Sequence, residues 1–219
     1  TEKLLSEIKE VQPTILSAVP RLYENIFKKI KSQIKSSNKL ISYLLRITFN
    51  LVDKEQKNLN FLQIMLGMLF IKFFLKKKIL NIFGNKIKVL ISGGAALNPS
   101  VGFFFNFIGI FLLQGYGQTE ASPLISCNRK TNNNPKTVGI PVKDVKVKIS
   151  NYGEILVSGK NLMEGYWKKK TLTNKTIKNG WLHTGDLGEI DNEGRIIITG
   201  RKKDLIVTSG GENISVQKI

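Results

Sequence analysis

Gly115-Tyr116-Gly117-Gln118-Thr119-Glu120 is the stretch on which the interpretation of this chain depends. It follows an apolar run over 108–113, whose length and β-branched or aromatic content suit a buried strand. Glycines after a strand let the backbone approach a ligand closely, because no Cβ stands in the way. A strand followed by glycines, a hydroxyl and a carboxylate therefore predicts a nucleotide site where the strand ends.

Three side chains of this stretch have chemistry that suits a nucleotide. Tyr116 offers a flat face to a base, Thr119 offers a hydroxyl to a phosphate, and Glu120 offers a hard oxygen ligand to Mg²⁺. A glycine-rich turn after a core strand explains the same six residues without any ligand, and a short glycine motif is weak evidence by itself. Both interpretations stay open on this stretch alone.

Three further motifs accompany the stretch. Ser-Gly-Gly-Ala-Ala-Leu at 92–97 precedes it, while Trp-Leu-His-Thr-Gly-Asp at 181–186 and Gly-Arg-Lys-Lys-Asp at 200–204 follow it. Together the four motifs resemble those of the adenylate-forming superfamily of acyl-CoA synthetases, luciferases and peptide-synthetase adenylation domains. The resemblance covers about residues 11–219. It implies an α/β fold with the C-terminal half of a large adenylate-forming domain (a βαβ sheet layer and a small distorted β-barrel) and the start of a small C-terminal α+β domain.

The segment Val19-Pro20-Arg21-Leu22-Tyr23-Glu24 narrows the resemblance to long-chain acyl-CoA synthetases. That family implies ATP, Mg²⁺, CoA and a long-chain fatty acid. The fatty carboxylate attacks the α-phosphate of ATP, which gives acyl-AMP and pyrophosphate, and the CoA thiol then displaces AMP. The acyl chain length cannot be read from the sequence. Transfer to a carrier-protein phosphopantetheine in place of CoA remains an alternative.

The resemblance also implies roles for single residues. Thr119 contacts phosphate, Glu120 holds Mg²⁺, and Lys203 is the hinge on which the small domain turns between the two half-reactions. Tyr116 stacks on adenine, while Asp186 and Arg201 hold the ribose. The other predicted nucleotide contacts are Gly93, Gly94, Ala95, Gln114, Gly115 and Gly117.

Each of these assignments has a plainer alternative. The glycines at 93–94 also suit the turn before a helix, and Asp186 also suits a solvated turn. The cations at 201–203 also suit a charged loop. His183 could act as a general base, but no Gly-x-Ser-x-Gly elbow accompanies it, so we expect a structural role.

Composition limits the remaining functions. The chain has 219 residues and is 42% hydrophobic, which argues against disorder. A single cysteine, Cys127, excludes an internal disulfide, and a single histidine excludes a Cys/His zinc site. The net charge of +18 fits two interpretations. The lysines either form solvated surfaces, or they form the basic surface of a non-catalytic protein that binds a membrane or a nucleic acid. Because the lysines are scattered and no nucleic-acid motif accompanies them, we expect no nucleic-acid partner and a cytoplasmic protein, with membrane association as an alternative.

The pattern of expected helices and strands divides the chain into three predicted parts. Residues 1–134 are expected to form a partial α/β subdomain, with a strand at 86–91, a helix at 99–107 and a strand at 108–113. Residues 135–202 are expected to form the β-rich subdomain, in which strict alternation at 145–149, a turn at 151–153 and a run at 154–158 predict a hairpin. Residues 203–219 are expected to be the hinge and the start of a C-terminal domain.

Two expectations concern the chain as a whole. It begins at Thr1 and carries neither the family's phosphate loop nor the lysine that contacts the carboxylate and the α-phosphate in this family. We therefore expect an internal piece of a longer protein that is inactive alone; its oligomeric state is unknown. The apolar stretch 61–75 contains Lys72 and is too short for a membrane span of about 20 residues. A buried or surface helix is expected there, with a helix lying on a membrane as the alternative.

Overall fold

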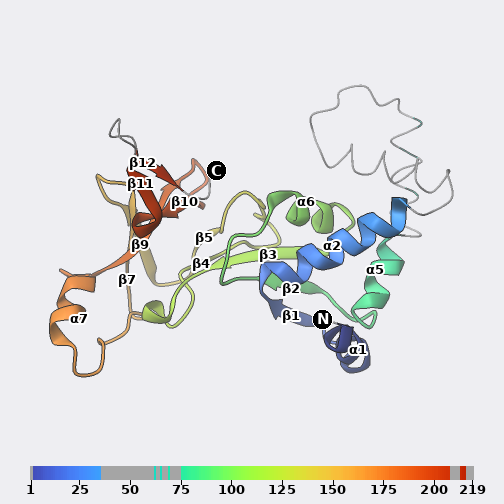
Figure 1. The fold of residues 1–219 in the computed structure, drawn as a ribbon, viewed down its shortest axis with the longest axis horizontal. Coiled ribbons are helices and arrows are strands. Elements are labelled where there is room, and N and C mark those ends of the chain that lie inside the picture. The colour runs from blue at the N-terminus through green and yellow to red at the C-terminus, as the bar shows by residue number, and fades with distance from the viewer. Residues whose placement is uncertain are drawn as a thin grey trace. The chain divides into compact units, whose positions relative to one another are not determined.

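The structure is a computed structural model, and it describes residues 2–35, 62, 65, 69, 75–207 and 213–215. The chain forms two compact units, which meet in sequence between Leu113 and Gln114. Figure 1 shows both units as ribbons, and each is described by itself below. The three predicted parts at 1–134, 135–202 and 203–219 follow a different division and stay a prediction.

The first unit is a small α/β assembly. Strands β1 and β2 pair in parallel, with Ile15 opposite Val89 and Ala18 opposite Ser92, and β3 is the next neighbour of β2. Helix α6 connects β2 to β3, so the predicted strand–helix–strand unit is present. The elements of this unit are α1 (Glu2–Val11), β1 (Ile15–Ala18), α2 (Pro20–Lys35), α5 (Lys76–Ile82), β2 (Val89–Ser92), α6 (Pro99–Phe107) and the first half of β3 (Phe111–Tyr116).

Helix α2 is held to this sheet by its apolar stripe and by one tyrosine. Leu22, Ile26 and Ile30 are buried on one face of the helix, at the spacing that brings residues together on one side. Tyr23 is also buried, and its hydroxyl donates to the carbonyls of Leu16 (3.0 Å) and Ile91 (2.9 Å). Burial raises the pKa of the Tyr23 phenol, which therefore stays protonated as a donor. One side chain thus ties α2 to both β1 and β2.

The predicted strand at 108–113 is wrong in its bounds. Ile108 and Gly109 instead end helix α6, because their backbone N–H groups donate to Phe104 and Asn106. Gly109 has φ +77°, a left-handed conformation that glycine adopts without steric cost. The strand begins only at Phe111 and runs to Tyr116, so the first glycine of the key stretch lies inside the strand. The predicted strand at 86–91 is similarly shifted, to β2 at Val89–Ser92.

The second unit is rich in β-structure. Its main sheet is antiparallel, with the order β10-β9-β7-β6, and β8 pairs with β9. The end of β3 pairs with β4, and β4 pairs with β5. The elements are η2 (Thr119–Ala121), β4 (Ser126–Cys127), β5 (Ile140–Pro141), β6 (Val145–Ile149), β7 (Glu154–Gly159), α7 (Lys170–Thr176), β8 (Ile177–Lys178), β9 (Trp181–Ile190), β10 (Ile196–Arg201), η3 (Lys202–Asp204), β11 (Leu205–Val207) and β12 (Asn213–Ser215).

The predicted β6–β7 hairpin is confirmed. Side chains of β6 alternate between half-buried and exposed, and Val145 to Ile149 pair with Gly159 to Ile155 of β7. Gly153 turns the chain with φ +78°. The core of this unit includes Ile155, Val157, Leu182 and Ile196, which are fully buried.

One sequence expectation falls largely outside the described residues. Of the apolar stretch at 61–75, only Leu62, Met65, Leu69 and Leu75 are described. Within the described ranges, no helix combines the length and the apolar character needed to cross a membrane.

Candidate functional site

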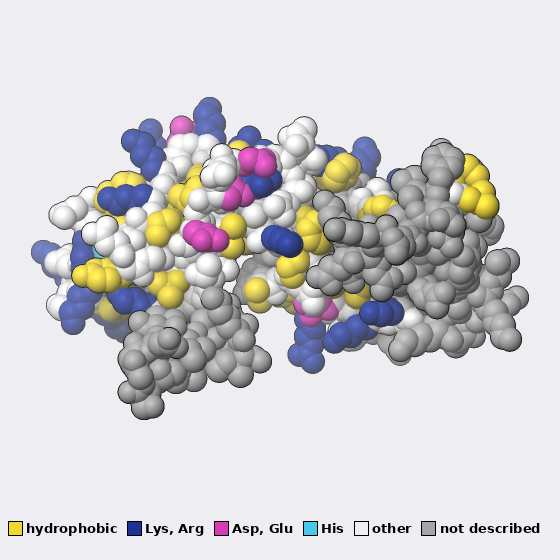
Figure 2. All heavy atoms as spheres, turned by 90° about the horizontal axis from the view of Figure 1, so that it is seen from above, with side chains coloured by type: hydrophobic (Ala, Val, Ile, Leu, Met, Phe, Trp, Pro, Cys, Tyr) yellow, Lys and Arg dark blue, Asp and Glu magenta, His cyan; other side chains and the backbone are white. Residues whose placement is uncertain are grey.

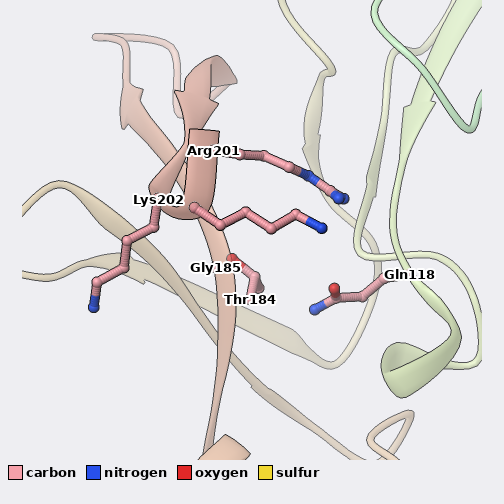
Figure 3. A pocket seen from close by; sticks show the side chains of 6 residues that line it. Gln118, Thr184, Gly185, Arg201 and Lys202 are labelled. Atoms are coloured by element: carbon pink, nitrogen blue, oxygen red, sulfur yellow. The ribbon is translucent and has the colours of Figure 1, made fainter. Parts of the chain in front are cut away.

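The second unit contains a hollow of about 400 Å³ beside the last residues of β10. Gln118 lies across this opening from Thr184 and Arg201 in Figure 3. Two of the predicted site residues, Arg201 and Lys203, line it. The remaining lining residues, which the sequence analysis did not select, are Gln118, Thr184, Gly185 and Lys202.

A buried carboxylate next to this hollow joins three predicted residues. Asp186 is only 4% exposed. Its Oδ2 accepts a hydrogen bond of 2.7 Å from the Tyr116 hydroxyl, and its Oδ1 accepts one of 2.7 Å from Arg201 Nε. Tyr116 comes from β3, Asp186 from β9 and Arg201 from β10, so three strands meet at one carboxylate.

The protonation of this cluster follows from its surroundings. Burial raises the pKa of the Tyr116 phenol, so Tyr116 donates to Asp186 at neutral pH. The guanidinium of Arg201 is always charged, and its side chain is 47% exposed, so one side of it remains open to solvent. An ionised carboxylate has about four acceptor positions. Asp186 therefore keeps the capacity to accept further hydroxyl groups.

The backbone leading to Asp186 is fixed by a hydroxyl and a glycine. The Thr184 hydroxyl donates to the Ile155 carbonyl (2.8 Å) and accepts from the Asp186 N–H (3.1 Å). Gly185 has φ +73°, a conformation that strains any residue with a Cβ. Because nothing lies within 4 Å of the position of a Cβ there, the backbone conformation alone calls for glycine.

Glu154 is the support that the sequence analysis missed. It is a buried residue at the start of β7, and its Oε1 accepts the Gly185 N–H at 3.0 Å. Its Oε2 lies 3.2 Å from His183 Nδ1 and 3.7 Å from Lys202 Nζ. Burial by itself would raise the pKa of Glu154, but the contacts with His183, the Gly185 N–H and Lys202 outweigh it and lower the pKa. Glu154 thus stays ionised and holds both the strand before Asp186 and one wall of the hollow.

Glu120, the predicted Mg²⁺ ligand, is held by a tyrosine. It lies in η2, and its Oε1 accepts a hydrogen bond of 2.7 Å from the Tyr166 hydroxyl. That hydrogen bond raises the pKa of Tyr166, which therefore acts as a donor. The Glu120 carbonyl accepts from the Met163 N–H at 2.9 Å, and the Asn161 side chain donates to the Ala121 carbonyl at 2.9 Å. Asn161, Met163 and Tyr166 thus hold the loop that carries Glu120.

One carboxylate is enough for a nucleotide-bound magnesium ion. In the described part of the chain, no three His, Cys, Asp or Glu side chains gather into a metal cluster. Mg²⁺ commonly takes one or two carboxylates, keeps several waters and completes its shell with substrate phosphates. Glu120 fits that pattern, and it does not fit a cage built from protein ligands alone.

The other predicted residues of the stretch have contacts inside the protein. Gln114 is buried, and its Nε2 donates to the carbonyls of Pro135 (2.7 Å) and Thr137 (3.3 Å). A Cβ at Gly117 would overlap the Pro123 carbonyl, so this glycine is required by packing within the loop. Thr119 begins η2, and Gly115 lies within β3. Nucleotide contacts of these four residues stay a prediction.

The first glycine motif belongs to the other unit. Gly93 follows β2, and its N–H donates to the Ala18 carbonyl at 3.3 Å. Gly94 has φ +83°, so the chain turns there in a conformation that suits glycine. Nucleotide contacts of Gly93, Gly94 and Ala95 stay a prediction.

Comparisons with known proteins agree with the family resemblance that the four sequence motifs indicate. The sequence model of the family described as AMP-binding enzyme matches residues 1–167. A long-chain-fatty-acid–CoA ligase of Mycobacterium bovis is 29% identical over 216 residues, which are 98% of this chain and 36% of that protein. The peroxisomal long chain acyl-CoA synthetase 7 of Arabidopsis thaliana is 34% identical over 236 residues, which are 99% of this chain and 33% of that protein. The chain thus spans about a third of the length of these relatives.

Solved structures share the fold. The o-succinylbenzoate coenzyme A synthetase of Bacillus subtilis in complex with AMP superposes with a TM-score of 0.63 at 22% identity, over 100% of this chain and 37% of that one. An amide bond synthetase of Marinactinospora thermotolerans gives a TM-score of 0.65 at 20% identity, over 99% of this chain and 37% of that one. At such identities the likeness concerns the fold alone, and it confirms the predicted fold class.

Proposed function

Because this chain belongs to the AMP-binding enzyme family, we propose that it carries part of the nucleotide site of an AMP-forming long-chain fatty acid–CoA ligase. The observation that carries the proposal is the buried Asp186 carboxylate, which Tyr116 and Arg201 hold behind a basic hollow that Arg201 lines. The names of the relatives support the substrate class, a long-chain fatty acid with CoA as acceptor.

In the proposed reaction, Asp186 accepts hydrogen bonds from the hydroxyl groups of the ATP ribose. Arg201 pairs with that carboxylate at 2.7 Å and adds positive charge next to the nucleotide. Lys202 and Lys203 line the same hollow, so the polyanionic substrate meets three cations there. Such a site lowers the activation barrier mainly by positioning its substrates and by neutralising charge.

The adenylation step is a displacement at phosphorus. An oxygen of the fatty carboxylate forms a bond to the α-phosphorus of ATP, and the bond to the bridging oxygen of pyrophosphate breaks. Magnesium, when bound, neutralises charge on the phosphates, and Glu120 is the residue that would hold it. The CoA thiol then loses its proton, attacks the acyl carbon and releases AMP. We propose that Thr119 contacts phosphate and that Lys203 is the hinge between the two steps.

Substitution of Glu120 tests this assignment. We expect Glu120→Ala in the full gene product to abolish Mg²⁺-dependent formation of acyl-AMP while the protein stays folded, because the carboxylate that would hold the ion is gone. The matched control is Glu164→Ala, which removes an exposed carboxylate from the same unit and should leave activity unchanged. Pyrophosphate release by Glu120→Ala at the wild-type rate would contradict the metal role.

The ribose assignment has its own test. A carboxylate that accepts a hydroxyl contributes about 1.5–3 kcal/mol to binding. ATP should therefore be a better substrate than 2′-deoxy-ATP by roughly tenfold or more in kcat/KM. Equal use of the two nucleotides by the wild-type protein would show that Asp186 does not bind the ribose 2′-hydroxyl.

A further inference from the structure

Residues 166–178, which contain helix α7, form a basic segment of the second unit, here called the lysine loop. The sequence between Glu164 and Asp186 holds five lysines and no acidic residue. Figure 2 shows Lys and Arg side chains spread over the visible face, so positive charge alone does not distinguish this segment. What distinguishes the loop is the exposed apolar surface that lies among its lysines.

Trp167 supplies most of this apolar surface. Its side chain is 85% exposed, although tryptophan is usually well buried in a folded protein. Lys168 Nζ lies over this ring, 5.7 Å from its centre, so a cation accompanies the exposed aromatic side chain. Leu172 is 44% exposed and lies with lysines around a hollow of about 350 Å³. The residues lining that hollow are Lys168, Lys169, Lys170, Thr171, Leu172 and Lys175.

The loop is held in a defined conformation. Thr173 Oγ1 accepts the Tyr166 N–H at 2.9 Å, and its hydroxyl donates to the Lys169 carbonyl at 3.2 Å. The Tyr166 hydroxyl is anchored in turn on Glu120. Helix α7 buries none of its side chains, and Figure 1 shows it at the margin of its unit, away from β10. The apolar side chains are therefore presented outward by a fixed backbone.

We propose that the lysine loop docks on an anionic lipid bilayer. Tryptophan favours the headgroup level of a bilayer, where its ring is partly apolar and its N–H can hydrogen-bond. Lysines around it complement the negative surface charge, and their long alkyl chains reach from the apolar level to the charged headgroups. Leu172 decides against a nucleic acid as the partner, because an aliphatic side chain gains nothing from phosphates but gains from acyl chains. The proposal does not depend on the ligase activity.

Flotation with lipid vesicles tests the docking surface. The full gene product is mixed with vesicles of phosphatidylcholine alone or of phosphatidylcholine with phosphatidylserine, and the bound fraction is measured at low and high salt. We expect binding only to the vesicles with phosphatidylserine, with loss at high salt because the charges are exposed. Changing Lys168, Lys169 and Lys170 together to Gln should weaken partitioning by roughly 100-fold, which corresponds to about 3 kcal/mol, or about 1 kcal/mol for each lysine.

Matched variants distinguish binding through the lysine loop from binding through the net positive charge of the protein. Lys136, Lys143 and Lys146 are exposed lysines of the same unit, and changing all three to Gln should weaken binding far less. Trp167→Ala should reduce binding, whereas Tyr152→Ala, which removes an aromatic side chain that is 89% exposed at the β6–β7 turn, should not. Circular dichroism of each variant checks that it is folded.

Three results would overturn the proposal. One is the absence of binding to vesicles with phosphatidylserine. Another is equal loss of binding in the two lysine triple variants, which would show that only net charge matters. The third is preferential binding of an RNA oligonucleotide that competes the protein off the vesicles, which would make nucleic acid the partner of the lysine loop.

Discussion

Removal of one hydroxyl, in Tyr116→Phe, separates the structural role of Tyr116 from its predicted role with adenine. The hydroxyl donates to the buried Asp186 carboxylate at 2.7 Å, and a hydrogen bond to a charged group contributes about 1.5–3 kcal/mol. Arg201 still pairs with the other carboxylate oxygen, so Asp186 keeps one partner. We therefore expect a loss of about 2 kcal/mol in the free energy of unfolding. For a chain of this size that corresponds to a decrease in Tm of roughly 4–8 °C.

The aromatic ring is tested by a second substitution. Tyr116→Phe keeps the ring, so ATP affinity should change less than stability. Tyr116→Leu removes the ring as well, and stacking on a base contributes about 1–3 kcal/mol, so ATP affinity should fall by roughly tenfold or more. Thermal unfolding measures the first effect, and titration calorimetry with ATP measures the second.

A control and a double-mutant cycle make this reasoning refutable. Tyr152→Phe removes an exposed hydroxyl and should leave Tm unchanged. Combining Tyr116→Phe with Asp186→Ala should cost about 2 kcal/mol less than the sum of the two single changes, because both remove the same hydrogen bond. Additive losses, or equal Tm values for Tyr116→Phe and Tyr152→Phe, would refute the claim that this hydrogen bond stabilises the fold.

Three further substitutions test neighbouring parts. The pKa of Glu154 is lowered in the folded protein, so its carboxylate stabilises the fold at pH values above its unfolded-state pKa of 4.5, and this stability is lost as the pH falls through the lower folded-state pKa. Glu154→Gln should therefore be less stable than the wild type at neutral pH and should lose less stability on acidification. Urea unfolding at several pH values measures both effects. Tyr166→Phe removes the hydroxyl that orients the Glu120 carboxylate, so it should raise the Mg²⁺ concentration needed for half-maximal adenylation several-fold without changing the KM for fatty acid. An unchanged Mg²⁺ requirement would argue that Tyr166 does not position Glu120. Lys203→Pro fixes φ at the predicted hinge, so single-turnover assays should find one half-reaction impaired far more than the other, and equal impairment would argue that Lys203 is not the pivot.

Local patterns predicted several elements because their causes lie within a few residues. The alternation over 145–149 and the turn at 151–153 sufficed for the β6–β7 hairpin. Asn98 caps helix α6 by accepting the Ser100 N–H at 2.9 Å, and Pro99 occupies its first turn, which agrees with the helix expected at 99–107. The start of β3 was placed too early because the apolar run at 108–113 continues through the end of α6, where a left-handed glycine separates helix from strand.

The site depends on contacts between residues distant in sequence, which no local pattern contains. Resemblance selected Tyr116, Asp186 and Arg201, but their hydrogen bonds arise from the pairing of β9 with β10 and from a contact across 70 residues. Glu154 had no motif to mark it, because a glutamate at the start of a strand usually faces solvent. Its function becomes visible only when β7 pairs with β9 and brings it to Gly185.

The measurement that tests the central claim most directly is fatty-acid-dependent exchange between labelled pyrophosphate and ATP, which reports adenylation without CoA. For the full gene product we expect exchange that requires Mg²⁺ and a long-chain fatty acid. Asp186→Ala should reduce this exchange by tenfold or more at subsaturating ATP, on the order of one lost charge-assisted contact. Glu189→Ala, which removes an exposed carboxylate of the same unit, should leave the exchange unchanged. No exchange by the wild-type protein, or undiminished exchange by Asp186→Ala, would contradict the assignment of this site to the adenylation of a fatty acid.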